Sequence, residues 1–136
     1  MQKKISFIST ATIILIFFLC PVQSKAANET PLLQKCLDAV DLGGLKITQW
    51  TACWAAELIR QDRELNSIYV RIQKISSPEL KRSLIKGQRA WLAYRDAWCS
   101  YEEFTPVAPG GSANKAACMV DVTITQINRL KNSSTD

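Results

Sequence analysis

The chain has 136 residues, 17 basic and 12 acidic side chains and no histidine, which gives a formal net charge of +5. This length allows one domain with one hydrophobic core. The absence of histidine removes the commonest general base and a frequent metal ligand, so the composition argues against a His-dependent enzyme or a His-containing zinc site.

The N-terminal segment has the order of a secretory signal peptide. Two lysines precede an apolar stretch over residues 5–20, and small residues follow up to Ala26. A membrane-spanning helix would need about 20 apolar residues, and this stretch is shorter and interrupted by Ser and Thr. We therefore expect residues 1–26 to be cleaved and residues 27–136 to form a single helical domain without a stable membrane anchor.

Cleavage would also change the charge balance. It removes three of the basic residues and none of the acidic ones, so 14 basic and 12 acidic residues remain. The net charge falls to +2, and the apparent basicity belongs largely to the leader. Because a nucleic-acid-binding domain needs an extensive basic patch, we expect no nucleic-acid partner.

Four cysteines remain after cleavage: Cys36, Cys53, Cys99 and Cys118. An even number in a small exported protein is typical of two disulfides. The alternative, a four-cysteine metal site, lacks the CxxC pairs that such sites use. We expect disulfides and no bound metal or cofactor.

The first two helices have recognisable start and stop signals. Thr30 and Pro31 suit the N-cap and first turn of a short helix that runs to about Val40, and paired glycines follow it. A long helix is predicted from about Thr48 to the turn at Ser76. Its apolar stripe has alternating spacings of four and three residues and consists of Trp54, Leu58, Gln61, Leu65, Ile68, Ile72 and Ile75.

A second long helix is predicted to begin at Pro78, with Ser77 as its N-cap. Its stripe has the same alternation, so we expect its aromatic rings to pack in the core; it consists of Leu80, Leu84, Gly87, Trp91, Tyr94, Trp98 and Tyr101. Two helices joined by a tight turn should be antiparallel neighbours. That arrangement would place Gly87 opposite Asn66, where a glycine would permit close approach of the helices.

A loop from about Thr105 precedes the last helix, which Ser112 or Asn114 would cap. The weaker stripe of this helix consists of Ala116, Val120, Thr123, Ile127 and Leu130. The predicted fold class is all-α: a small disulfide-stapled helical bundle built on a long antiparallel helix hairpin with two shorter helices.

Folding the hairpin brings the cysteines to the end of the bundle opposite the Ser76-Ser77 turn. Geometry leaves three pairings open. We favour Cys36 with Cys53 and Cys99 with Cys118, because each bond closes a local connection between consecutive helices.

A polar seam runs beside the apolar stripes, with Asp62 and Asn66 on one long helix and Gln88 and Arg95 on the other. Asp facing Arg, and Asn facing Gln, could satisfy one another at the edge of the core. A binding groove or an acid/base carboxylate is the alternative interpretation. We favour a structural network and expect no catalytic residues, because no nucleophile–base pair or second convergent carboxylate accompanies the seam.

These residues also carry a family resemblance. The segments are Asp62-x-x-Leu65-Asn66-x-x-Tyr69, then Gln88-Arg89-Ala90-Trp91-Leu92-x-Tyr94-Arg95-Asp96-x-x-Cys99, then Gly110-Gly111-Ser112, and Cys118 followed by Thr123. Together they resemble the LprI-type lysozyme-inhibitor-like domain of bacterial envelope proteins. The resemblance implies a secreted, periplasmic or lipid-anchored helical domain, and the naming member of the family inhibits lysozyme. The chain departs from the family at Leu19-Cys20, which lacks the small residue of a lipidation site, and at Gln49, where a Glu is expected.

The leading functional hypothesis is a periplasmic or secreted, non-enzymatic binding protein of a Gram-negative-type envelope that inhibits lysozyme. The loop up to Asn114, with Ser112 and Lys115, is the candidate element for blocking an active-site cleft. The alternative is an envelope protein-interaction or stress-associated helical module without lysozyme activity, which would use an exposed apolar patch near Trp50 and Trp54. An enzyme is the least favoured class.

Overall fold

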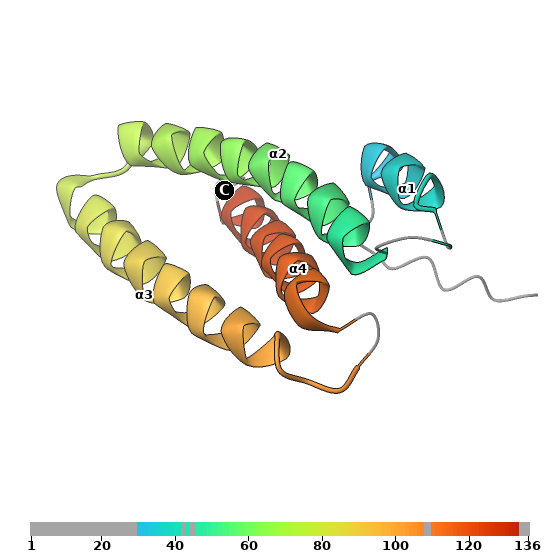
Figure 1. Ribbon diagram of the computed structural model, residues 1–136. Coiled ribbons are helices and arrows are strands. Elements are labelled where there is room, and N and C mark those ends of the chain that lie inside the picture. The colour runs from blue at the N-terminus through green and yellow to red at the C-terminus, as the bar shows by residue number, and fades with distance from the viewer. Residues whose placement is uncertain (1–29, 42, 44–45, 108–109, 134–136) are drawn as a thin grey trace, which may run out of the picture.

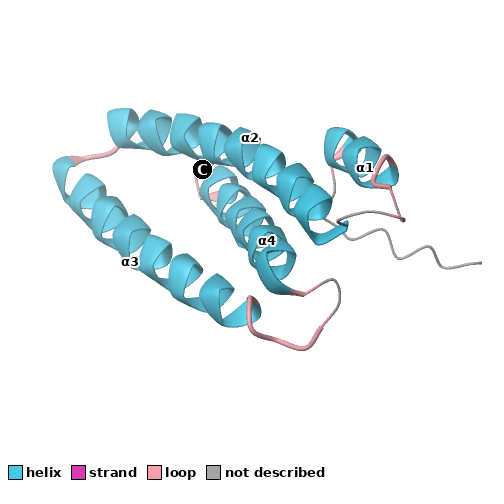
Figure 2. Ribbon diagram, viewed as in Figure 1, coloured by secondary structure: helices cyan, strands magenta, loops and turns pink. Residues whose placement is uncertain are grey.

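The computed structural model describes residues 30–41, 43, 46–107 and 110–133, and the regular secondary structure of these residues is entirely helical (Figure 2). The helices are α1 (Pro31–Asp38), α2 (Lys46–Ile75), α3 (Pro78–Glu102) and α4 (Gly111–Asn132). The all-α fold class is confirmed. None of these helices is long and apolar enough to cross a membrane. The predicted signal peptide lies outside the described residues.

Two helix starts follow the sequence signals closely. The Thr30 hydroxyl accepts a hydrogen bond from the Leu33 amide at 3.2 Å, and Pro31 opens α1. The Ser77 hydroxyl accepts from the Leu80 amide at 3.3 Å at the start of α3. Each hydroxyl satisfies one of the backbone N–H groups that the first turn of a helix leaves without a partner.

Helix α4 is the centre of the fold (Figure 1). It packs along both α2 and α3, whereas α2 and α3 barely contact each other, and α1 contacts α2. The expectation that the two long helices pack directly together is therefore wrong. The tight turn at Ser76 fixes the two helices at one end only. Along the rest of their length the buried stripe of α4 offers each of them a better apolar surface than the other long helix does.

The apolar core lies between α2 and α4. Leu65 and Ile68 of α2 pack with Ile127 and Leu130 of α4, and four partly buried side chains close around this cluster: Tyr69, Ile72, Leu84 and Trp91. The α4 stripe, which the sequence marks only weakly, is thus the most completely buried one, because it is covered from two sides.

The stripe of α3 is the main correction to the sequence analysis. Its buried residues are Gln88, Arg95 and Cys99, whereas Tyr94 is 55%, Trp98 45% and Tyr101 61% exposed. The rings lie on the flank of the helix, and only Leu84 and Trp91 of the predicted stripe reach the core cluster. Leu80 and Gly87 are also exposed, as is Ile75 at the end of the α2 stripe; all three were expected to be buried.

The role expected of Gly87 is wrong as well. A Cβ atom added at this position would meet no atom within 4 Å. The glycine therefore permits no close helix approach, because none of the described helices lies against α3 at this position.

Two disulfides staple the bundle. Cys36–Cys53 joins α1 to α2 with a Cα–Cα distance of 5.7 Å, and Cys99–Cys118 joins α3 to α4 at 5.4 Å. These are the pairs favoured from the sequence. Both lie at the end of the bundle opposite the α2–α3 turn, since they involve the N-terminal part of α2 and the C-terminal part of α3.

Candidate functional site

A buried carboxylate that the sequence analysis missed joins α1 to α2. Glu57 is fully enclosed, and its two oxygens accept four hydrogen bonds. Gln61 Nε2 donates at 2.6 Å, Arg60 Nε at 3.0 Å and Thr30 Oγ1 at 2.9 Å, and Arg60 Nη2 also donates. The Thr30 hydroxyl therefore acts twice, as acceptor in the α1 cap and as donor to Glu57. Through its hydrogen bond from Thr30, the Glu57 carboxylate holds the N-terminus of α1 against α2.

The surroundings of Glu57 favour its charged form. Burial raises the pKa of this carboxyl by desolvation, but hydrogen bonds from Gln61, Arg60 and Thr30, together with the Arg60 charge, outweigh burial and lower the pKa. A proton-transfer catalyst at neutral pH needs the opposite shift and access to substrate. Glu57 has neither property, so its role is structural.

Arg95 is the hub of a second network, which links all three long helices. Its Nη1 donates to Asp62 Oδ1 of α2 at 3.0 Å and to Thr123 Oγ1 of α4 at 3.1 Å. The guanidinium also lies 5.0 Å from the ring centre of Trp91, within the range of a cation–π contact. The predicted Asp62–Arg95 pair is present, and its location at the edge of the core fits a role in fixing helix register.

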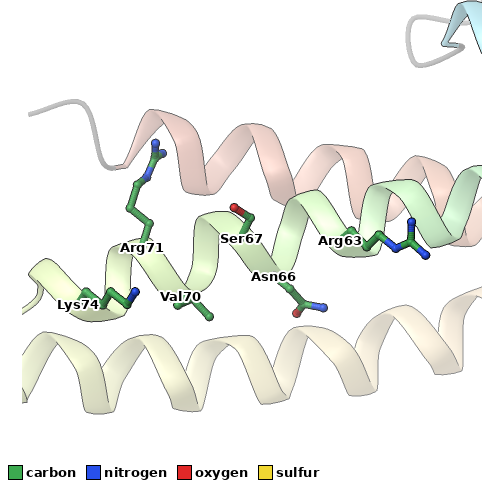
Figure 3. Close-up of a pocket in the computed structure, with 6 residues that line it drawn as sticks. All are labelled: Arg63, Asn66, Ser67, Val70, Arg71 and Lys74. Atoms are coloured by element: carbon green, nitrogen blue, oxygen red, sulfur yellow. The ribbon is translucent and has the colours of Figure 1, made fainter.

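The second predicted pair of the seam is wrong. Gln88 accepts a hydrogen bond from Gln126 of α4 at 3.0 Å, because α4 occupies the position expected of α2. Asn66 is exposed and lines an open pocket on α2, where its side chain points toward α3 (Figure 3). The other lining residues are Arg63, Ser67, Val70, Arg71 and Lys74.

The loop before α4 is held by Asn114, one of the candidate binding residues. Its Oδ1 accepts from the Gly110 amide at 3.0 Å, and its Nδ2 donates to the Val107 carbonyl at 2.8 Å. Gly110 (φ 88°) and Gly111 (φ 55°) adopt left-handed backbone conformations, which favour glycine. Asn114 is thus committed to ordering the loop and has little capacity left for a partner.

The other candidate binding residues lie around the same end of the bundle. The Ser112 hydroxyl is exposed and lies 3.0 Å from Thr51 Oγ1. Lys115 Nζ is 3.0 Å from Glu103 Oε2. Trp50 is half-buried in the early part of α2. These residues retain exposed surface, but most of their polar groups already have internal partners.

Several exposed aromatic side chains lie in the C-terminal part of α3 and just beyond it, and we call them the aromatic face: Tyr94, Trp98, Tyr101 and Phe104. The Tyr94 and Trp98 ring centres lie 6.5 Å apart with an interplanar angle of 15°, and Trp98 and Tyr101 lie 5.6 Å apart. Phe104, just beyond α3, is 83% exposed. The aromatic face runs along the C-terminal part of α3, which the Cys99–Cys118 disulfide ties to α4, so a rigid element presents it. Exposed rings grouped in this way make this face a candidate interaction surface.

Within the described residues, no group of His, Cys, Asp and Glu could hold a metal ion. The charged groups that are buried, Glu57 and Arg95, are both used in helix-to-helix contacts. The two networks and the two disulfides hold together the helices that carry the aromatic face.

Comparison with known proteins gives one match. Residues 45–130, well over half of the chain, match the family model described as "Lysozyme inhibitor LprI". No curated protein and no solved structure matches the chain. The matched region contains α2, α3, all but the last two residues of α4, the Arg95 network and the aromatic face, but not α1.

Proposed function

The chain belongs to the lysozyme inhibitor LprI family, and on that premise we propose that it is a non-enzymatic envelope protein that binds and inhibits a lysozyme-type muramidase. The family match over residues 45–130 carries this proposal. The two disulfides support residence outside the cytoplasm, since such bonds persist in oxidising compartments. We further propose that residues 1–26 are the export signal and that the processed protein is periplasmic or secreted.

We assign the inhibitory contact to the aromatic face. Tyrosine and tryptophan are enriched among the interface residues that contribute most to binding. Trp98 precedes Cys99 of the α3–α4 disulfide, so little backbone freedom would be lost when a partner binds. Ser112, Lys115 and Trp50 would contribute at the rim of such a contact, with Asn114 keeping the neighbouring loop in place.

Local charge favours the same end of the molecule. Residues 90–104 contain three acidic side chains, Asp96, Glu102 and Glu103, and one basic side chain, Arg95. Animal-type lysozymes are generally basic, and association is faster when opposite charges face each other. Asp96 pairs with Arg95 and Glu103 pairs with Lys115, so Glu102 is the acidic side chain of this segment that remains available for such attraction.

The test is titration of the protein, purified after export by an expressing strain, against a panel of lysozymes of different classes. Mass spectrometry of the same sample reports the cleavage site. We expect inhibition of at least one lysozyme at micromolar concentration or below. Absence of inhibition across the panel at micromolar concentration would refute the proposal.

Matched variants locate the surface. Trp98→Ala should weaken inhibition at least about tenfold, since truncating a central interface Trp costs about 2 kcal/mol or more. Leu80→Ala is the control, because this side chain is also exposed on the same helix but lies at the opposite end. If both variants inhibit as strongly as the wild type, the aromatic face is not the inhibitory surface, although the protein is still a lysozyme inhibitor.

A further inference from the structure

The charges of this protein are segregated along the α2–α3 hairpin. Residues 63–89 carry seven basic side chains and only two acidic ones, Glu64 and Glu79. Glu64 is already paired with Lys131 of α4. The seven basic residues are exposed and form no ion pair within the part of the chain that the structure describes: Arg63, Arg71, Lys74, Lys81, Arg82, Lys86 and Arg89. The modest net charge of the chain therefore conceals one strongly basic end.

This basic end projects from the bundle. The Lys131–Glu64 pair marks where the last turn of α4 lies against α2, and the α2–α3 turn extends beyond that point (Figure 1). We call residues 71–86 the hairpin tip. Because an α-helix rises 1.5 Å per residue, all residues of the tip lie within about 15 Å of the turn. Five of the seven cations belong to it.

The apex of the tip is apolar. Ile75 is 72% and Leu80 63% exposed, and they flank the turn at Ser76 and Ser77. Neither side chain belongs to the core cluster or the residues packed against it. The tip thus combines two exposed aliphatic side chains with five exposed basic side chains and one exposed acidic one, Glu79.

We propose that the hairpin tip docks onto an anionic phospholipid surface. Ile75 and Leu80 enter the boundary between headgroups and acyl chains, and the surrounding Lys and Arg side chains contact lipid phosphates. Peripheral membrane binding of this kind increases with buried apolar area and with attraction to anionic lipids. A dissolved polyanion would use the cations but would leave the apolar apex without a role, so the combination favours a bilayer.

Docking by the tip would orient the molecule. The aromatic face begins at Tyr94 and extends to the far end of α3, and Leu80 and Tyr101 are separated by about 30 Å of helix. A tip-bound protein would hold the aromatic face away from the bilayer. This inference does not depend on lysozyme inhibition, because the two surfaces lie at opposite ends.

The test is co-sedimentation of the exported protein with vesicles of phosphatidylglycerol mixed with phosphatidylcholine, and with vesicles of phosphatidylcholine alone. We expect binding to the anionic vesicles, weakening with added salt, and little binding to the neutral ones. Equal binding to both vesicles, or to neither, overturns the proposal.

Two double variants and a matched control assign the contact. Lys81→Glu with Arg82→Glu should reduce partitioning to anionic vesicles at least tenfold. Lys35→Glu with Lys46→Glu changes the net charge equally at the other end of the bundle and should reduce partitioning less than threefold. Equal loss in both double variants would indicate a net-charge effect and overturn the assignment to the tip.

The apolar contribution is tested with Ile75→Ser and Leu80→Ser together. The partition coefficient of this variant for anionic vesicles should be at least threefold lower than that of the wild type. Its elution from a heparin column should be unchanged. Unchanged vesicle binding would identify a purely electrostatic polyanion site and overturn the bilayer proposal.

All the substituted tip residues are exposed, and thermal unfolding followed by circular dichroism checks that each variant is folded. Lysozyme inhibition measured on the same samples should be unchanged, so failure of either proposal is visible separately.

Discussion

Replacement of Glu57 by Gln tests the interpretation of the buried carboxylate most directly. The substitution preserves shape and removes only the charge. Hydrogen bonds to a charged group contribute about 1.5–3 kcal/mol, against about 0.5–1.5 kcal/mol for neutral pairs. In Glu57→Gln the new amide N–H group also faces the Gln61 donor, so Gln61 must turn its own amide to restore a bond.

The expected loss follows from the exposure of the three donors. Gln61 is buried and loses its charged acceptor completely. The Arg60 side chain is 38% exposed, so water replaces part of its interaction, and Thr30 is half-buried at the surface end of α1. We therefore expect Glu57→Gln to lower the free energy of unfolding by about 2 kcal/mol near neutral pH.

The pH dependence distinguishes a charge effect from a packing effect. The folded pKa of Glu57 is lowered from the ordinary value of 4.5, so the unfolded chain takes up the proton first as the solution is acidified. The stabilisation is fully present above 4.5 and is lost as the pH falls from there through the lower folded pKa. The difference between wild type and Glu57→Gln should therefore shrink in acid.

Urea unfolding followed by far-ultraviolet circular dichroism, from about pH 7 to about pH 3, measures this difference. Glu64→Gln is the matched control. It removes an exposed carboxylate of the same helix that pairs with Lys131, and should change stability by less than about 0.5 kcal/mol. A stability gap for Glu57→Gln that stays constant down to the lowest pH would refute the electrostatic reasoning.

Three further predictions concern the bundle. Gly87→Ala should stabilise the protein by about 0.5–1 kcal/mol, because the added methyl meets open space and helix propensity improves; destabilisation in urea unfolding would show a close helix contact after all. Arg95→Lys should cost about 1–2 kcal/mol, more than Asp62→Asn, because the Arg95 side chain is 10% exposed and Asp62 40%; the reverse order would contradict its role as hub. Replacing Cys99 and Cys118 by Ser should cost about 3 kcal/mol for a sequence separation of 19 residues, measured by thermal and urea unfolding.

Local sequence signals predicted local structure well. Thr30-Pro31 and Ser77-Pro78 each determine a helix start through one hydroxyl and one fixed φ angle. The residues that determine each helix start lie within four residues of it in the sequence.

Helix neighbours were predicted less well, because periodicity gives the apolar side of a helix but not what covers it. The stripe through Trp91 and Trp98 has regular spacing, yet α4 packs against the adjacent side through Gln88 and Arg95. A hydrogen-bonded polar side chain is buried here in preference to a larger ring. The hydrophobicity of single residues cannot predict which side of α3 is buried, because this depends on Gln126 and Thr123 of α4 as hydrogen-bond partners.

A signal for Glu57 was nevertheless available. Cys53, Glu57, Gln61 and Leu65 are spaced four residues apart and lie on one side of α2, and both ends of that series are apolar. An acidic residue in such a series must be paired if it is buried. Its partners lie one turn along the same helix and in the cap of α1, which only the folded chain brings together.

The central position of α4 has a consequence for how the protein folds. Contacts of α2 with α4 span long stretches of chain, with separations of 61 residues for Thr51 and Ser112 and 67 for Glu64 and Lys131. Such non-local contacts slow folding, because a large loop must close before they form. The α2–α3 hairpin has no core of its own while α4 is absent. Because Ile127 and Leu130 of α4 make up half of the buried core cluster, that cluster can be completed only after the fourth helix has been made.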